Sequence, residues 1–240
     1  MKSFTELLEG VYDPNIFKAF FMAGGPGSGK SFAVQKGIGQ VQKGVRVTAQ
    51  GLKVVNSDDI FEKYLKDAQL DFKMQAGQKS ERDKLRTKAK EVTRKRQDNY
   101  IEGRLGMVID GTGKDYGKIS TQASGLKQIG YDVHMIFVNT SLDVALERNE
   151  KRPRSVPEDI VKKSWNQVQS NIGKFQQFFG NKNFIIVDNN DVGDDVFGMV
   201  GTQVKKMLSR KVDNYLAKAW IAKELRLKQR WCWYSQYYYF

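Results

Sequence analysis

The feature that most constrains the fold is a glycine-rich stretch, residues 24–31, which reads GGPGSGKS and fits the spacing G-x-x-x-x-G-K-[ST] in full. An apolar run, 17–23, precedes it, and apolar residues at helical spacing follow it (Val34, Ile38, Val41). The sequence therefore predicts a strand, a tight turn and a helix in this order. Glycines in such a turn let consecutive backbone N–H groups converge on a phosphate, and the helix start adds its positive dipole end.

This loop predicts a nucleotide site, with ATP and Mg²⁺ as the expected cofactors. Lys30 is expected to reach the β- and γ-phosphate oxygens, and the hydroxyl of Ser31 to bind Mg²⁺. A chance glycine-rich turn is the alternative, which the flanking strand and helix disfavour. The residues expected to contact the nucleotide are Gly25, Pro26, Gly27, Ser28, Gly29, Lys30, Ser31 and Phe32.

Strand-like and helix-like segments alternate along the chain, which predicts an α/β P-loop NTPase fold: a five-stranded parallel sheet with helices on both faces, plus a C-terminal basic helical extension. Three parts are expected, an N-terminal helix and lead-in (1–16), a P-loop domain (17–190), and a basic helix with an aromatic tail (191–240). The predicted strands are 17–23, 52–55, 107–110, 133–138 and 184–187. Continuous helices are predicted over 155–179 and 194–228. Residues 45–55 fit either a hairpin or a short excursion before the second strand.

Carboxylates follow two of the predicted strands, where the ends of parallel strands meet. Asp58 and Asp59 follow the second strand, and we favour Asp58 as the general base that accepts a hydroxyl proton. Capping of the next helix is its alternative role. Asp110 closes the third strand, as a Walker-B carboxylate does, and is the expected second Mg²⁺ ligand; a turn-forming aspartate before Gly111 is the alternative.

Two arginines, Arg148 and Arg152, are four residues apart and are expected on one helical face. Both would close over a transferring phosphoryl group, where an arginine strongly accelerates transfer. A basic helix end in solvent is the alternative.

Positive charge is concentrated in two stretches. The net charge is +13, and residues 79–104 and 205–230 carry ten and nine Lys/Arg against five and two Asp/Glu, so that +5 and +7 make +12 of it. Such helices would bind nucleic acid through its phosphates. Solvated helix faces are the alternative, since no base-reading motif accompanies the charge.

Several further features bound the environment and partners. No run of eighteen apolar residues and no signal-peptide core occur, so neither a membrane span nor secretion is expected. One cysteine, Cys232, excludes an internal disulfide. We expect a cytoplasmic protein, in the host cytoplasm if a phage encodes it; the sequence leaves the oligomeric state open.

The aromatic tail, 231–240, would dock on a protein partner, stack on bases or fold back onto the body. His134, inside a strand, is expected to pack rather than catalyse.

The motifs together resemble a family. The loop 24–31, N-S-D-D at 56–59, V-I-D-G-T at 108–112 and R-N-E-K-R at 148–152 with V-P-E-D-I at 156–160 are similar in order and spacing to the bacteriophage polynucleotide 5′-hydroxyl kinase domain and to zeta-toxin-like kinases. The resemblance spans about residues 17–190. It implies an ATP-dependent kinase with Lys30 and Ser31 on ATP and Mg²⁺, Asp58 as base, Asp110 organising the metal and acceptor side, and Arg148 and Arg152 as the lid.

Two departures bear on the substrate. The polynucleotide kinases resemble one another in an arginine three residues after the base, and here that position is Phe61, with Lys63 the nearest cation in sequence. No D-x-D-G-T segment occurs near residue 188, so no phosphatase activity is expected. A polynucleotide 5′-OH is the first-choice acceptor. A nucleotide sugar or other small hydroxyl compound is the alternative, and a nucleotide-gated binding or assembly protein without transferase activity is a second one.

Overall fold

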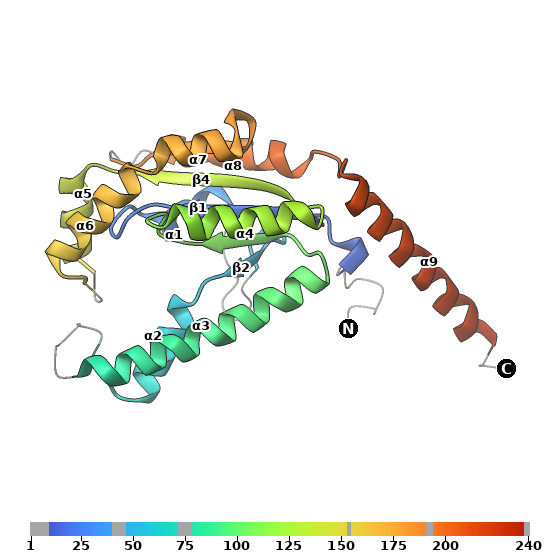
Figure 1. Ribbon diagram of the computed structural model, residues 1–240, viewed down its shortest axis with the longest axis horizontal. Helices are drawn as coiled ribbons and strands as arrows, with labels where there is room; N and C mark the ends of the chain where they lie inside the picture. Colours follow the sequence, from blue (N-terminus) through green and yellow to red (C-terminus); the bar gives the residue numbers. More distant parts are fainter. Residues whose placement is uncertain (1–9, 40–46, 72–77, 153–154, 191–193, 238–240) are drawn as a thin grey trace.

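In the computed structural model, residues 10–39, 47–71, 78–152, 155–190 and 194–237 are described. Five parallel strands form one sheet in the order β2-β3-β1-β4-β5, which confirms the predicted sheet (Figure 1). Their bounds are β1 Lys18–Ala23, β2 Lys53–Val55, β3 Met107–Asp110, β4 Asp132–Asn139 and β5 Phe184–Asp188. The chain leaves β1 towards β3 and β2 and returns past it to β4, so the strand order reverses at β1. Ligands of open α/β sheets bind beside such a reversal, outside the carboxyl ends of the strands.

The central strand, β1, is buried along its whole length, as expected for a strand covered on both faces. It pairs with β3 so that Met22 lies opposite Asp110, and with β4 so that Ala23 lies opposite Phe137. The register therefore places the end of β3 directly beside the start of the glycine-rich loop.

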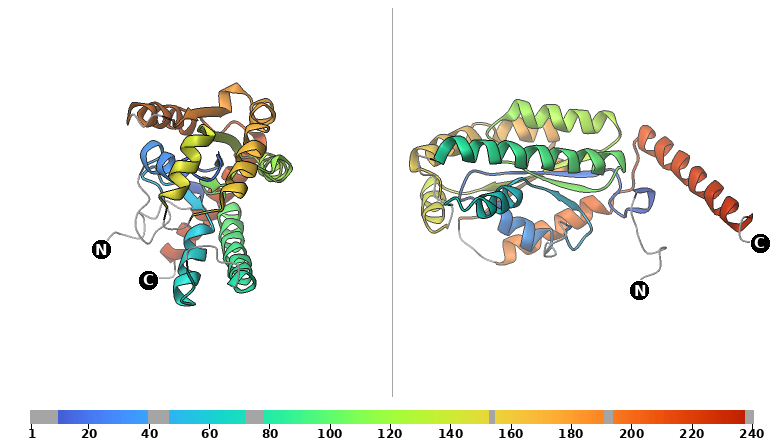
Figure 2. Two further views of the ribbon diagram at one scale, coloured as in Figure 1. Left: turned by 90° about the vertical axis from the view of Figure 1, so that its left-hand side faces the viewer. Right: turned by 90° about the horizontal axis from the view of Figure 1, so that it is seen from below.

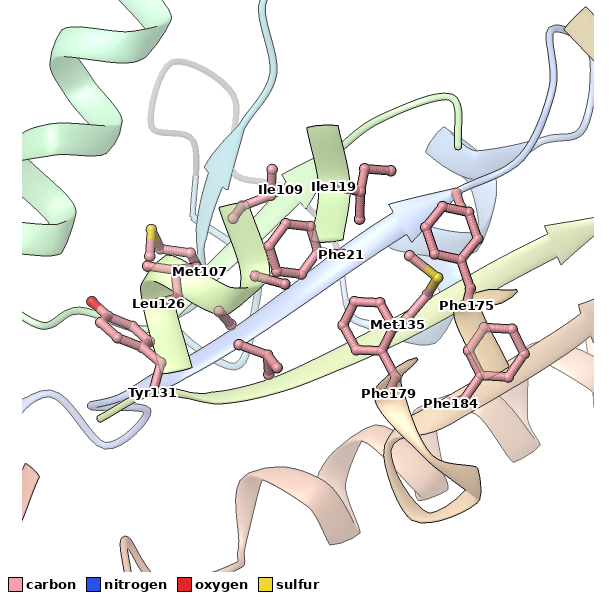
Figure 3. Packing of buried hydrophobic residues seen from close by; sticks show 14 of the residues in the cluster. Phe21, Met107, Ile109, Ile119, Leu126, Tyr131, Met135, Phe175, Phe179 and Phe184 are labelled. Carbon is pink, nitrogen blue, oxygen red and sulfur yellow. The ribbon is translucent and has the colours of Figure 1, made fainter. Parts of the chain in front are cut away.

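Helices cover both faces of the sheet (Figure 2). On one face α4 (Tyr116–Gln128), α7 (Ile172–Phe179) and the first turns of α9 (Tyr215–Tyr237) pack on β1, β3 and β4. Figure 3 shows Phe21 and Met135 of the sheet beside the rings of Phe175 and Phe179. On the other face lie α1 (Lys30–Gly37) and α8 (Asp194–Leu208).

Helices α2 (Asp58–Asp67) and α3 (Lys79–Glu102) form an arm that leaves the sheet after β2 (Figure 1). The arm has a small apolar core of its own, in which Ile60, Phe61 and Leu65 of α2 pack against Ala89 of α3. This packing fixes how α3 faces the start of α2.

The helix predicted over 155–179 is two helices, α6 (Glu158–Gln169) and α7. Its apolar stripe does not continue as one helix because Asn171 is buried and donates to the carbonyls of Gly113 and Lys114, each at 3.0 Å. These bonds tie the break to the loop after β3. The prediction of one continuous helix was wrong because the side chain of Asn171 has long-range partners.

The basic helix predicted over 194–228 is also interrupted, between α8 and α9. Val212 packs against the sheet-side core in the interruption, and the Asn214 side chain accepts the Leu216 N–H to start α9. The stretch 205–230 is therefore not a single straight charged surface. Farther along, α9 leaves the body of the molecule (Figure 1).

Three expectations concern segments at the edges of the described residues. The predicted N-terminal helix over 3–10 lies outside the described residues except for Gly10, which opens the short helix η2 (Gly10–Tyr12). Val47 makes an isolated antiparallel bridge with Lys53, so a tight turn leads into β2. The side chains of the aromatic tail, 231–240, lie outside the description. The helices of the described part are all too short or too polar to cross a membrane.

Candidate functional site

The glycine-rich loop joins β1 to α1 as the motif requires, and two of its glycines have positive φ where another element packs closely. A Cβ on Gly27 (φ +80°) would lie 2.1 Å from the carbonyl oxygen of Ala145 in α5 (Leu142–Glu150). A Cβ on Gly29 (φ +84°) would lie 2.3 Å from Nδ2 of Asn189, which donates to the Ser28 carbonyl at 2.7 Å. Helix α5 and the end of β5 therefore brace the loop from outside.

Lys30 opens α1, and its ammonium lies over the loop. Its Nζ donates to the carbonyl oxygens of Gly24 at 2.6 Å and Gly25 at 3.3 Å. Burial lowers the pKa of Lys30, the carboxylate of Asp110 acts against this, and the guanidinium of Arg152 lowers the pKa further. Lys30, Asp110 and Arg152 thus lie within electrostatic range of one another.

Asp110 ends β3 beside the loop. Burial raises its pKa, while the charge of Lys30 lowers it and the neighbouring carboxylates Asp58 and Asp59 raise it. One of its oxygens, Oδ2, accepts from Nδ2 of Asn56 at 2.8 Å, and the other, Oδ1, is buried and accepts no hydrogen bond from the described residues. A buried carboxylate oxygen without a donor suits a cation.

The donor set fits Mg²⁺ bound together with phosphates. Among the described residues no three His, Cys, Asp or Glu side chains gather as an all-protein metal site. Mg²⁺ commonly takes one or two protein oxygens and fills its octahedron with phosphate oxygens and water. Asp110 and the exposed hydroxyl of Ser31 are such oxygens.

Asp58 is the first residue of α2, and its carboxylate turns towards α3. Ser57 occupies the N-cap position, so the expected alternative, an Asp58 cap, does not hold. Oδ1 of Asp58 accepts from Nη1 of Arg86 at 2.6 Å, and Asn56 Oδ1 accepts the Asp58 backbone N–H at 2.7 Å. Asp58 is half-buried, whereas Asp59 is exposed. Asn56 therefore links Asp58 to Asp110.

The two predicted lid arginines do not share a helical face. Arg148 lies in α5, and Arg152 lies past the end of that helix, because the following proline disfavours helical conformation in the residue before it. Arg148 donates to the carbonyls of Asn189 at 2.7 Å and Asn190 at 3.3 Å, which holds it beside the loop. Arg152 is exposed and acts on the pKa values of Lys30 and Asp110.

The side chain of Asn149, three residues before Arg152, is hydrogen-bonded to the backbone of Val156, four residues after it. Asn149 is buried; its Nδ2 donates to the Val156 carbonyl at 2.7 Å and its Oδ1 accepts the Val156 N–H at 3.0 Å. Nearby, Trp165 of α6 donates to the Thr140 carbonyl at 2.8 Å. The start of the segment, α5 and α6 thus form one unit next to the loop.

Four side chains of this site were missed from sequence: Asn56, Arg86, Asn149 and Asn189. Asn56 and Asn149 stand inside the motifs N-S-D-D and R-N-E-K-R, so their position next to charged residues was a usable signal. Arg86 and Asn189 reach the site only through tertiary packing. Phe32 was expected to contact the nucleotide; its side chain is partly buried and packs against the apolar core between the sheet, α1 and α8.

His134 is buried in β4 and stacks on Phe20 with ring centroids 4.7 Å apart. Its pKa is lowered to about 4, mainly by burial and in addition by the charge of Lys18. Its packing role is as expected.

The chain is similar to a known family and to several solved structures. A family model described as Zeta toxin matches residues 13–194. Among solved structures, the AvrRxo1-ORF1:AvrRxo1-ORF2 complex with ATP aligns with a TM-score of 0.56 at 14% identity, over 82% of this chain and 65% of that one. The same complex with sulphate ions gives a TM-score of 0.55 at 14% identity, over 82% and 66%. A structure from the PezAT toxin–antitoxin system of Streptococcus pneumoniae has a TM-score of 0.45 at 16% identity, over 86% of each chain.

The chain thus spans just under two thirds of the length of the AvrRxo1 complex chains. At these identities the likeness establishes the fold and not the activity. No curated protein sequence matches this chain.

Proposed function

Because the chain belongs to the zeta toxin family, whose members have a P-loop kinase fold, we propose that it transfers the γ-phosphoryl group of ATP to a hydroxyl group of an acceptor. One observation carries the proposal: Asp58, Asp110 and Arg152 come from three further segments and each lies close enough to Lys30 to shift its pKa, outside the carboxyl ends of β1, β2 and β3. A loop that only held a nucleotide would need no carboxylate on the acceptor side.

The nucleotide side of the site is the glycine-rich loop with Lys30. Backbone N–H groups of the loop bind the phosphates, and the Lys30 ammonium moves from the loop carbonyls to the β- and γ-phosphate oxygens. Ser31 and Asp110 are the residues that would hold Mg²⁺, whose charge offsets that of the phosphates. Arg152 faces the transferring group, and Arg148 keeps the end of β5 against the loop.

The acceptor side is Asp58. As the acceptor oxygen attacks the γ-phosphorus, its proton passes to the Asp58 carboxylate, the bond between the γ-phosphorus and the β–γ bridging oxygen breaks, and ADP leaves with the electron pair. A positioned base of this kind contributes roughly 10²- to 10⁴-fold in rate. The Asn56 side chain donates to Asp110 and accepts the backbone N–H of Asp58, which fixes the position of the proposed base relative to a residue that would hold Mg²⁺.

Two acceptors remain candidates. The net positive charge of residues 79–104, which include all of α3, favours the 5′-OH of a polynucleotide. Phenylalanine at position 61 and the family match favour a small hydroxyl compound such as a nucleotide sugar.

An acceptor screen with γ-labelled ATP tests the proposal. Label on a 5′-OH oligonucleotide supports the polymer, label on UDP-N-acetylglucosamine supports the nucleotide sugar, and ATP binding without transfer to any acceptor would overturn the kinase in favour of a nucleotide-gated binding protein. Asp58→Ala and the isosteric Asp58→Asn are expected to abolish transfer with ATP affinity nearly unchanged. An equal loss of ATP affinity would remove Asp58 from the acceptor side.

A further inference from the structure

The start of α2 faces one turn of α3, and the contact between them is made by a charged side chain. Nη1 of Arg86 lies 2.6 Å from Oδ1 of Asp58, and the Arg86 guanidinium lies 4.9 Å from the centroid of the Phe61 ring. Asp58 and Phe61 are three residues apart and so lie on one face of α2. Arg86 therefore contacts the proposed base and the aromatic ring one turn later at the same time.

The two contacts fix the guanidinium without burying it. Phe61 is 5% exposed and belongs to the small core of the arm, so its ring is a rigid support. The Arg86 and Asp58 side chains are 34% and 37% exposed, so both reach the solvent on the acceptor side. A guanidinium has five N–H donors in a planar fork, and the bond to Asp58 Oδ1 uses one of them.

We propose that Arg86 is the acceptor-binding cation of this kinase, and that the acceptor is a hydroxyl compound with a phosphate near the reacting hydroxyl. This rests on the proposed function and names its substrate class. Arg86 holds the Asp58 carboxylate in place with one edge and binds the acceptor phosphate with another. A guanidinium supported on an aromatic ring suits a planar, bidentate contact with phosphate oxygens, which an ammonium does not reproduce.

The surroundings of α3 fit an anionic acceptor. An open hollow of about 910 Å³ lies along residues 79–91 of α3, and its charged lining is Lys79, Lys84 and Lys88 against Asp83 and Glu91, a small excess of positive charge. Lys88 also stacks over Tyr64 of α2, 5.2 Å from the ring centroid. Cations held against aromatic rings of α2 thus recur along the helix that carries Arg86.

Acceptor pairs that differ by one phosphate-containing group test the proposal: adenosine 3′-phosphate against adenosine, and UDP-N-acetylglucosamine against N-acetylglucosamine. The wild-type protein is expected to prefer the phosphorylated member of at least one pair in kcat/KM. In Arg86→Ala this preference is expected to fall about 10- to 100-fold, the usual range for one charge-assisted bond to phosphate. Arg86→Lys keeps the charge and the fold of the arm but is expected to recover only part of the preference.

Arg94→Ala is the matched control, because Arg94 is an exposed arginine about two turns farther along α3. It is expected to leave the preference within about twofold of wild type, and none of the three variants is expected to change ATP affinity. Unchanged preference in Arg86→Ala, with thermal unfolding and ATP affinity as in wild type, would overturn the proposal. So would a wild-type protein that treats both members of each pair alike.

Calorimetric binding of the same compounds separates this inference from the proposed function. If no acceptor is phosphorylated but adenosine 3′-phosphate or UDP-N-acetylglucosamine binds in an Arg86-dependent way, the kinase proposal fails and the phosphate subsite stands. If transfer occurs but neither binding nor preference depends on Arg86, the kinase stands and the subsite fails.

Discussion

Replacing Asn149 with alanine is expected to slow phosphoryl transfer without removing any group that touches ATP. The buried Asn149 amide makes two hydrogen bonds to the backbone of Val156, which bracket the segment that carries Arg152. Each such bond contributes about 1 kcal/mol net, so the variant loses roughly 2 kcal/mol of preference for the observed arrangement. At about 1.4 kcal/mol per tenfold, the population in which Arg152 takes its proposed place over the phosphoryl group is expected to fall up to about 30-fold.

The assay is single-turnover transfer at saturating ATP, with nucleotide affinity measured separately. Lys151→Ala is the control, because Lys151 is an exposed neighbour whose ion pair with Glu147 is a surface pair worth little. The decisive comparison is a double-mutant cycle with Arg152→Ala. If Asn149 acts by placing Arg152, Asn149→Ala has little further effect once Arg152 is gone. Fully additive losses would refute this reasoning.

Three other outcomes are expected. Lys30→Ala is expected to abolish transfer and weaken ATP binding, and unchanged equilibrium binding of ATP would contradict the placement of its ammonium on the phosphates. Arg152→Lys is expected to lower turnover because an ammonium does not reproduce the planar fork, and wild-type rates would remove Arg152 from the mechanism. The folded-state pKa of His134 is about 4 against 6.5 for an ordinary histidine, so its neutral form stabilises the fold above pH 6.5 and this stability is lost as the pH falls towards 4. Urea unfolding is expected to show about 2 kcal/mol less stability at pH 5 than at pH 7.5, and His134→Gln is expected to remove most of this difference; an equal pH dependence in the variant would contradict it.

The nucleotide side of the fold could be predicted because its signals are local. The glycine spacing of 24–31, the buried strand before it and the carboxylate at the end of β3 each depend on a few consecutive residues. Parallel strands then bring the ends of β1 and β3 together whatever the loops contain. The interruption at Asn171 could not be predicted in this way, because the apolar stripe keeps its period across it and only the carbonyls after β3 explain the break.

The acceptor side shows where local pattern stops being sufficient. Leu85 and Ala89 belong to the apolar stripe by which α3 packs on α2. Arg86 is next to Leu85 and three residues before Ala89, so the face of α3 that carries Arg86 could be predicted from the sequence. Its partner could not be predicted, because Lys63 is closer in sequence to the base while Arg86, 28 residues away, makes the ion pair with it. Pairing Arg86 with Asp58 requires the rotation of α3 against α2, and a shift of one residue would turn the guanidinium by about 100° around the helix axis. The cation beside the proposed base thus depends on the packing of Phe61 and Ala89, and a change in that small core is expected to alter acceptor recognition before it alters ATP binding.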